Sequence, residues 1–321
     1  MAGLKAIKLK IRSVEKTRKV TKAMEAVSAS KMRKSQTKAL GGRAYARAAV
    51  SILARISGSK EMLNHPLTRG TEELLSGTAG RRGDASENNS SVPRTLYIVI
   101  TSDKGLAGAL NSGVCRTVWA DIQKSGTAAS VIAVGRKAND FFLARKIFVE
   151  AYHPNTDQVS SLLIRELVDT AATHFSNGDV GIVKIAYQNF ISTFEQRPTI
   201  RTVFPLTLGE LSLVVGDIVP ARGVFAQTAP EAKQPATYTI EPSESEVLNN
   251  ILPRLAAIFV YHALLETQAS EHSARMVAMK SASDKAAEMT DRLKLTFNKA
   301  RQAAITREVS EITGGMEAMS V

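Results

Sequence analysis

Apolar residues recur at steps of three and four residues near the start of the chain. Leu4, Ile7, Ile11 and Val14 follow this spacing, which is the seam of a two-stranded coiled coil. The seam then becomes less regular and more polar, through Thr21, Met24, Val27 and Met32. Because no proline occurs before Pro66, the pattern predicts a helix over about residues 4–57.

The same spacing is longer and more regular at the other end of the chain. It runs from Val247 to Arg307 in steps of three or four residues, which predicts a helix roughly 90 Å long at 1.5 Å per residue. Ser243 or Ser245 is the expected N-cap, and Gly314-Gly315 the expected end. Pro253 predicts a kink or a later start.

A helix of that length does not fit inside a compact chain of 321 residues, whose radius of gyration would be about 20 Å. We therefore expect it to protrude as a rod. The N-terminal helix carries the other long apolar stripe, so the two are expected to pair. Both join the middle of the chain at their inner ends, so the pair should be antiparallel, with both chain termini at the far tip.

Between the two ends, short apolar runs alternate with amphipathic stretches. Strands are predicted at 95–100, 130–134, 147–151, 180–187 and 199–205, and helices at 106–124, 137–145 and 158–175. This rhythm predicts a Rossmann-like α/β domain with an open, mostly parallel, doubly wound sheet. The expected organisation is an N-terminal coiled-coil helix (1–60), a flexible connection (61–94), the α/β domain (95–215), a linker (216–243) and a C-terminal coiled-coil helix (244–321).

Charge separates the N-terminal helix from the rest of the chain. The net charge is +12, and the excess of Lys and Arg lies in residues 1–60, where Glu15 and Glu25 are the only acids. Such an arm suits nucleic-acid phosphates, an acidic protein partner, or solvent alone. Tyr45 is the only aromatic residue there, so base stacking is not supported. The bases surround the helix, which favours a sleeve-like protein partner, with a basic coiled-coil nucleic-acid binder as the alternative.

Catalytic and metal-binding patterns are missing from the sequence. The segment 101–111, TSDKGLAGALN, lacks G-x-G-x-x-G, and the chain has no P-loop. Asp103 and Lys104 are therefore read as part of a tight turn, with phosphate binding as the rival interpretation. The five histidines lack zinc-like spacing, and Cys115 is the only cysteine. We expect no catalytic residues, no cofactor and no metal.

Two further patterns bear on location. No uncharged apolar run reaches the roughly 18 residues of a membrane span, and the N-terminus lacks the apolar core of a signal peptide. A single cysteine suits a reducing compartment. From these patterns we expect a bacterial-type cytosolic protein that partners dock to a membrane.

Three segments resemble one known family. They are TKAMEAVSASKMRK at 21–34, ASEHSARMVAMKSASDKA at 269–286 and KARQAAITREVSEITGG at 299–315, and they are similar to the gamma subunit of the F-type ATP synthase. The turn at 101–111 also resembles that family, whose usual Asp-Arg-Gly-Leu-Cys-Gly differs here at Lys104 and Ala107. With one cysteine, the regulatory cysteine pair of chloroplast relatives is excluded.

The resemblance implies a non-catalytic rotor. The coiled coil would be the central shaft inside a ring of three alpha and three beta subunits, and the beta subunits would carry the catalysis. The α/β domain would sit with the epsilon subunit at the foot of the shaft, which is the end that rests on the proton-driven c-ring. The shaft would transmit torque between ring and foot, so that ATP synthesis or hydrolysis is coupled to proton flow.

The resemblance also implies partner-contact residues. Arg301, Gln302 and Thr306 match positions that hydrogen-bond a loop of a catalytic beta subunit. Met24, with Lys22 and Lys31, matches the stretch that faces the acidic lever of the beta subunits. Glu241, in an Ile-Glu-Pro stretch, matches a foot residue that touches the c-ring.

Overall fold

The computed structural model describes residues 2–41, 62, 64–68, 94–207 and 243–319. These residues belong to two compact units, one formed by residues 1–30 with 275–321 and the other by residues 31–274. Two long helices, α1 (Ala2–Gly41) and α9 (Glu244–Met319), contribute to both units. The predicted helix beyond residue 41, the predicted loop at 76–93 and, except for Ser243, the predicted linker at 216–243 lie outside the described residues.

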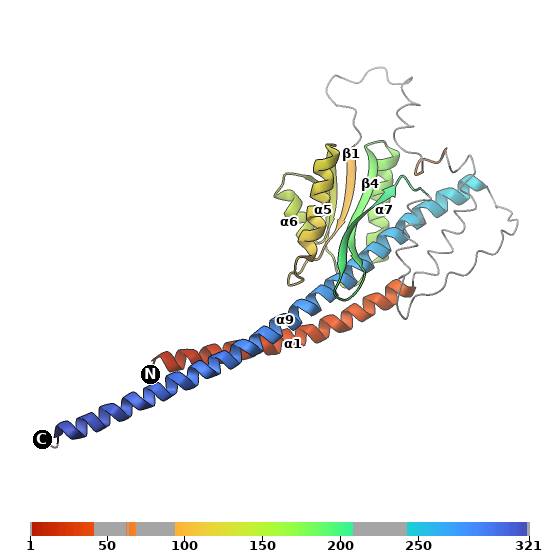
Figure 1. Ribbon diagram of the computed structural model, residues 1–321. Helices are drawn as coiled ribbons and strands as arrows, with labels where there is room; N and C mark the ends of the chain where they lie inside the picture. Colours follow the sequence, from red (N-terminus) through yellow and green to blue (C-terminus); the bar gives the residue numbers. More distant parts are fainter. Residues whose placement is uncertain (1, 42–61, 63, 69–93, 208–242, 320–321) are drawn as a thin grey trace. The chain divides into compact units, whose positions relative to one another are not determined.

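The larger unit is built on a five-stranded sheet (Figure 1). Its strands are ordered β3-β2-β1-β4-β5. Neighbours pair in parallel except for β4 and β5, which are antiparallel. The prediction of a mostly parallel open sheet is therefore confirmed, with one antiparallel edge. The strands are β1 (Arg94–Ile100), β2 (Ala129–Val134), β3 (Phe148–His153), β4 (Val180–Phe190) and β5 (Gln196–Phe204).

Side chains of the sheet alternate between two apolar cores. Along β1, Tyr97 and Val99 face the core built by α5 (Leu110–Ser125) and α6 (Arg136–Leu143), whereas Leu96, Ile98 and Ile100 face the opposite core. That second core is completed by α7 (Ser161–Ser176) and by the first part of α9. The alternation follows from the period of two in a strand, and it makes β1 a strand buried on both faces.

The beginning of α9 is a core helix. Its apolar face, which includes Leu248, Leu252, Leu255 and Phe259, packs into the second core. Ser243 is the N-cap, because its Oγ accepts a hydrogen bond of 3.2 Å from the Glu246 N–H. One 18-residue window of α9 is apolar and long enough to span a membrane, yet half of that window is buried within the protein, as expected for a core helix.

Three expectations for the long helices were wrong in detail. The helix α9 begins at Glu244 and includes Pro253, so a later start is wrong, and a kink at Pro253 stays a prediction. It also continues through Gly314 and Gly315 to Met319, so the two glycines are not its end. In α1, Val27 is 56% exposed, whereas Ser28 is 3% exposed and takes the seam position. A helical period of 3.6 accounts for this shift, since Ser28 lies seven residues after Thr21.

Candidate functional site

The smaller unit is an antiparallel pair formed by the first part of α1 and the last part of α9, with both chain termini at the same end (Figure 1). The buried positions of α9 here are Arg275, Met279, Ser283, Ala286 and Thr290, and the last four follow the predicted spacing of three and four. In α1 they are Thr21 and Ser28. Most of these side chains are small, so the seam buries little apolar area.

The threonine hydroxyls at this seam bond within their own helices. The hydroxyls of Thr21 and Thr290 donate to carbonyl groups of their own helices, at 3.0 Å to Arg18 and 2.8 Å to Ala286. An ion pair between the two helices joins Lys294 to Glu15 at 3.4 Å, at exposed positions. Exposed pairs of this kind contribute roughly 0–1 kcal/mol, so the stability of the pair depends mainly on its narrow seam.

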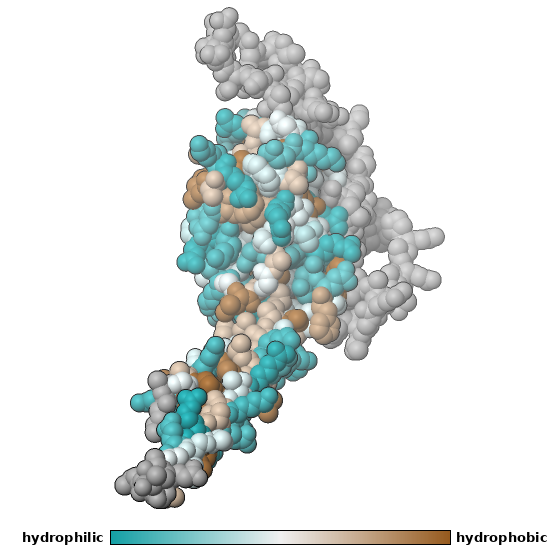
Figure 2. Space-filling model, turned by 60° about the vertical axis from the view of Figure 1, so that its left-hand side comes forward, coloured by the Kyte–Doolittle hydropathy of each residue, from teal (hydrophilic) through white to brown (hydrophobic). Residues whose placement is uncertain are grey.

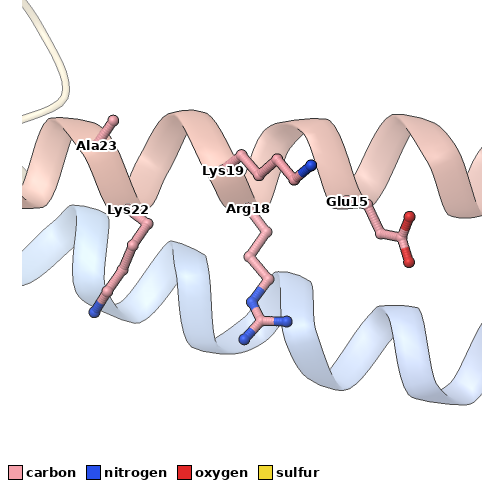
Figure 3. Close-up of a pocket in the computed structure, with 5 residues that line it drawn as sticks. All are labelled: Glu15, Arg18, Lys19, Lys22 and Ala23. Atoms are coloured by element: carbon pink, nitrogen blue, oxygen red, sulfur yellow. The ribbon is translucent and has the colours of Figure 1, made fainter.

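The outward surface of α1 is basic. A shallow hollow of about 650 Å³ is lined by Glu15, Arg18, Lys19, Lys22 and Ala23. Figure 3 shows Arg18 and Lys22 projecting to one side of α1, while Lys19 runs in another direction. Lys22 pairs with Glu25 of its own helix at 3.2 Å. Such an open cationic surface suits an acidic partner segment.

The last turns of α9 expose apolar side chains. Ile305, Val309, Ile312 and Met316 follow steps of four, three and four residues and are 48–65% exposed. Figure 2 shows the coiled-coil unit with apolar side chains interspersed among hydrophilic ones. A stripe of this kind is the feature by which a protein partner recognises a helix.

The predicted contact residues are placed at several points along these helices. Arg301, Gln302 and Thr306 are exposed on α9, and the Thr306 hydroxyl donates to the Gln302 carbonyl at 3.0 Å. Met24 is half-buried and Lys22 is exposed, both in the smaller unit. Lys31 belongs to the larger unit, where it pairs with Asp157 at 2.6 Å. The structure thus does not bring all of them together, and Glu241 lies outside the described residues.

The turn after β1 is bonded to the start of α6. Asp103 Oδ1 accepts the Arg136 N–H at 2.8 Å and Thr101 Oγ1 accepts the Ala138 N–H at 2.9 Å. The Asp103 carboxylate is thus used in a structural bond, whereas phosphate binding was expected at the start of the helix that follows the turn, α5. The tight-turn interpretation is favoured over phosphate binding.

The other candidate chemical groups also have structural surroundings. Cys115 is buried, and burial raises the pKa of its thiol to about 12, so it is a poor nucleophile near neutral pH. Among the described residues, no cluster of His, Cys, Asp or Glu has the arrangement of a metal site. His262 and His272 are buried on α9, as expected for packing residues.

Comparison with known proteins identifies the family. The ATP synthase family matches residues 3–319. The chain is 36% identical to the ATP synthase gamma chain of Heliobacterium modesticaldum over 99% of this chain and 100% of that protein. It is also 36% identical to the gamma chain of Symbiobacterium thermophilum, over 98% of each. The chain belongs to the ATP synthase gamma chain family.

Solved structures agree with this fold. The chain is similar to a subunit of the Euglena gracilis mitochondrial ATP synthase, with a TM-score of 0.61, 18% identity and coverage of 99% of this chain and 95% of that one. It is also similar to a central-stalk or c-ring chain from Tetrahymena thermophila, with a TM-score of 0.54, 23% identity and coverage of 82% and 99%.

Family membership confirms the main functional prediction. As a member of this family, the protein is a non-catalytic subunit of the ATP synthase and serves as its rotor shaft, and it is a peripheral part of the membrane-bound complex. None of the relatives reported above supports the nucleic-acid alternative. The sequence pattern missed one feature that the structure contains, a run of buried polar residues on α9, because polar residues in a helix carry no periodic signal of burial.

Proposed function

We propose that the coiled-coil unit turns inside a ring of alpha and beta subunits while the α/β domain is carried, with the epsilon subunit, on the c-ring. The observation that carries this proposal is the surface of the coiled-coil unit. It combines a narrow seam, a basic face on α1 and an exposed apolar stripe near the end of α9. A partner that surrounds the unit would use all three features, whereas a partner on one side would leave some of them in water.

The exposed charges of the coiled-coil unit also suit rotation inside a ring. A shaft that turns against a ring must not be trapped at one angle, and exposed ion pairs of roughly 0.2–1 kcal/mol guide a partner without trapping it. Different faces of the unit present different side chains to the ring. Each catalytic site would therefore meet a different contact energy at each angle, which is the basis of coupling between distant sites.

Individual residues can be assigned to this proposal. Arg301, Gln302 and Thr306 would hydrogen-bond a beta subunit, and the cationic surface near Lys22 and Met24 would face an acidic segment of the beta subunits. Lys31 would face the same segment, since an ammonium has three N–H donors and the bond to Asp157 uses one of them. Glu241 would touch the c-ring. In a bacterial host the complex would lie on the cytoplasmic face of the plasma membrane.

The proposal is tested by isolating the tagged chain from its own membranes and measuring native mass and ATP hydrolysis on one sample. The expected result is one copy of this chain in an ATP-hydrolysing assembly with several copies of two larger subunits. A lone chain without ATPase activity would contradict the proposal. A chain that carries nucleic acid would favour the alternative, and its binding would then weaken steeply with added salt.

A further inference from the structure

The buried face of α9 changes from apolar to polar at one point along the helix. Up to Leu265 it consists largely of Leu, Ala, Val and Phe side chains. The next turns bury polar side chains instead, and Thr267, Ser270 and Ser273 are 0% exposed. We refer to Glu266, Thr267, Ser270 and Ser273 as the polar collar. All four lie in the larger unit, and each bonds the backbone of the β4–β5 hairpin.

The polar collar occupies an open edge of β4. Pairing of β4 with β1 ends at Ala186, opposite Val99, although β4 continues to Phe190. Beyond that point, Thr267 Oγ1 accepts the Gln188 N–H at 3.3 Å and Ser270 Oγ donates to the Gln188 carbonyl at 3.3 Å.

The next bonds continue along the same edge. Glu266 Oε2 accepts the Phe190 N–H at 2.7 Å. Gln188 and Phe190 are two residues apart, so their N–H groups point to the same side of the strand. Side chains of α9 therefore take the place of a neighbouring strand. Ser273 Oγ then donates to the Thr193 carbonyl in the hairpin turn at 2.7 Å.

A second loop is fastened to the same part of the shaft. Gln268 Nε2 donates to the Thr156 carbonyl at 2.8 Å. The neighbouring residue of that loop, Asp157, accepts a hydrogen bond of 2.6 Å from Lys31 Nζ of α1. Both long helices are thus tied to the α/β domain by polar bonds within the larger unit.

These bonds restrict the rotation of α9 about its own axis, which apolar packing alone would leave comparatively easy. Burial of apolar area is non-directional, whereas a hydrogen bond weakens steeply when its angle and distance change. Rotating α9 by one residue position, about 100°, would break all the bonds of the polar collar. It would also leave the buried backbone groups of Gln188 and Phe190 without these partners, and unsatisfied buried groups are costly.

We propose that the polar collar is the torque coupling of the shaft, because it fixes the rotational register of α9 on the α/β domain. Force applied to the α/β domain then passes into α9, which continues without a break to Met319. This inference rests on the rotor function proposed above. Thr267 and Ser270 are positioning residues in this account, since they hold the helix and touch no substrate.

The test uses the assembled complex with Thr267→Val and Ser270→Ala, singly and together, and with Ser273→Ala. Thr267→Ser is the conservative variant that keeps a hydroxyl. Thr173→Val is the matched control, because Thr173 is exposed on α7 and its hydroxyl donates to the Asp169 carbonyl of the same helix at 2.7 Å. Three quantities are measured: assembly, the ratio of ATP-driven proton pumping to ATP hydrolysis, and the angular fluctuation of a bead attached to the α/β domain while the catalytic ring is immobilised.

Loss of the collar bonds is expected to broaden the angular fluctuation and to lower the pumping-to-hydrolysis ratio, with Thr267→Ser close to wild type. Each lost bond should lower the equilibrium constant between the locked and the rotated arrangement of α9 roughly fivefold. A merely structural role would reduce the yield of complex but leave the stiffness of each assembled complex unchanged. If the combined variant fails to assemble, the single variant Ser273→Ala decides, since Ser273 bonds the hairpin turn rather than the strand.

Two failures are distinguishable. Wild-type stiffness and pumping ratio in complexes that contain the combined variant, or Ser273→Ala, would overturn the torque coupling and leave the rotor function intact. A wild-type chain that does not support ATP-driven pumping in its own complex would overturn the rotor function, and the inference with it. An equal effect of Thr173→Val would also overturn the inference, because that hydroxyl is remote from the polar collar in the chain.

Discussion

Lys31 Nζ donates a hydrogen bond of 2.6 Å to Asp157 Oδ2 and so joins α1 to the loop that follows β3. The two residues are 126 positions apart in the sequence. The bond from Lys31 holds the pKa of the Asp157 carboxyl below its usual range, and the charges of Lys31, Lys104 and His272 act in the same direction. The lowered pKa indicates that the ionised form of Asp157 is preferred in the folded chain.

Lys31→Met and Asp157→Asn are expected to act on stability as a pair. Both side chains are more than one-third exposed, so their interaction should contribute only about 0.2–1 kcal/mol. A double-mutant cycle in urea at neutral pH measures this coupling. Since the folded pKa of Asp157 is lowered, the coupling should be complete above the unfolded pKa of about 3.9 and disappear as pH falls through the folded pKa. Additive effects of the two substitutions at pH 7 would contradict the prediction.

Asp121 accepts two hydrogen bonds of 2.7 Å on the same oxygen, from Tyr97 Oη and from Lys184 Nζ. Burial by itself would raise the pKa of Asp121, but the bonds from Lys184 and Tyr97 and the charge of Lys184 together lower it. Burial, followed by the bond to Asp121, raises the pKa of the Tyr97 phenol, which therefore stays protonated. Asp121→Asn is expected to cost about 1–3 kcal/mol at pH 7, because it weakens two bonds to a partly buried site.

The contribution of Asp121 to the unfolding free energy should decrease in acid. The contribution of Asp121 should be fully present above its unfolded pKa of about 3.9 and be lost as pH falls through its lowered folded pKa. The difference in unfolding free energy between wild type and Asp121→Asn should therefore shrink between neutral pH and pH about 3. Asp140→Asn is the control, since Asp140 is exposed and pairs with Arg136 at 4.0 Å. A difference that is constant over this range would show that the Asp121 carboxylate is not responsible.

The two kinds of periodicity in the sequence account for most of what could be predicted. Steps of three and four residues predicted α1 and α9, and the buried run at 95–100 predicted β1. Both follow from local geometry, because the face that a residue occupies depends only on its place in the repeat. The division of the chain into five segments stays a prediction.

The polar collar could not be predicted in the same way. Thr267 and Ser270 are buried because β4 extends beyond the last residue that pairs with β1. The sequence around residue 267 carries no information about the relative lengths of these two strands. Lys31 likewise has no local signal for its bond to a residue of a distant loop. The family resemblance placed Lys31 among partner contacts, and the structure adds an intramolecular bond to that prediction.

Gly135 is a position where only glycine fits. Its φ is +96°, and a Cβ there would overlap the backbone carbonyl of Thr101. Thr101 also accepts the Ala138 N–H at the start of α6, so the backbone cannot move away without losing that bond. Gly135→Ala is therefore expected to lower the unfolding free energy by at least about 2 kcal/mol, measured by thermal or urea denaturation.

Gly113→Ala is the control for that experiment. A Cβ at Gly113 would meet Gln188 Nε2 at 3.7 Å, which is an ordinary contact, and Gly113 lies within α5. This substitution should stabilise the chain by about 0.5–1 kcal/mol through the higher helix propensity of alanine. Equal stability of the two variants would mean that the close approach of Thr101 to Gly135 is not maintained in solution.

Arg301→Ala tests the proposed contact with the beta subunits. Arg301 is exposed on α9, so its removal should change the stability of the chain by no more than about 0.5 kcal/mol. A hydrogen bond from a guanidinium to a partner is worth about 1.5–3 kcal/mol, so ATP-driven proton pumping by the assembled complex should fall roughly tenfold or more. The measurement compares pumping and hydrolysis in membrane vesicles with the melting temperature of the purified chain.

Lys299→Ala is the matched control for Arg301→Ala. Lys299 is also exposed and cationic, and it lies about 200° away around the same helix, so a contact made by Arg301 is not available to it. Loss of pumping in both variants would indicate a general effect of charge on the shaft rather than a bond made by one side chain. Normal pumping by Arg301→Ala would remove Arg301 from the contact surface, and Gln302 and Thr306 would then have to be tested separately.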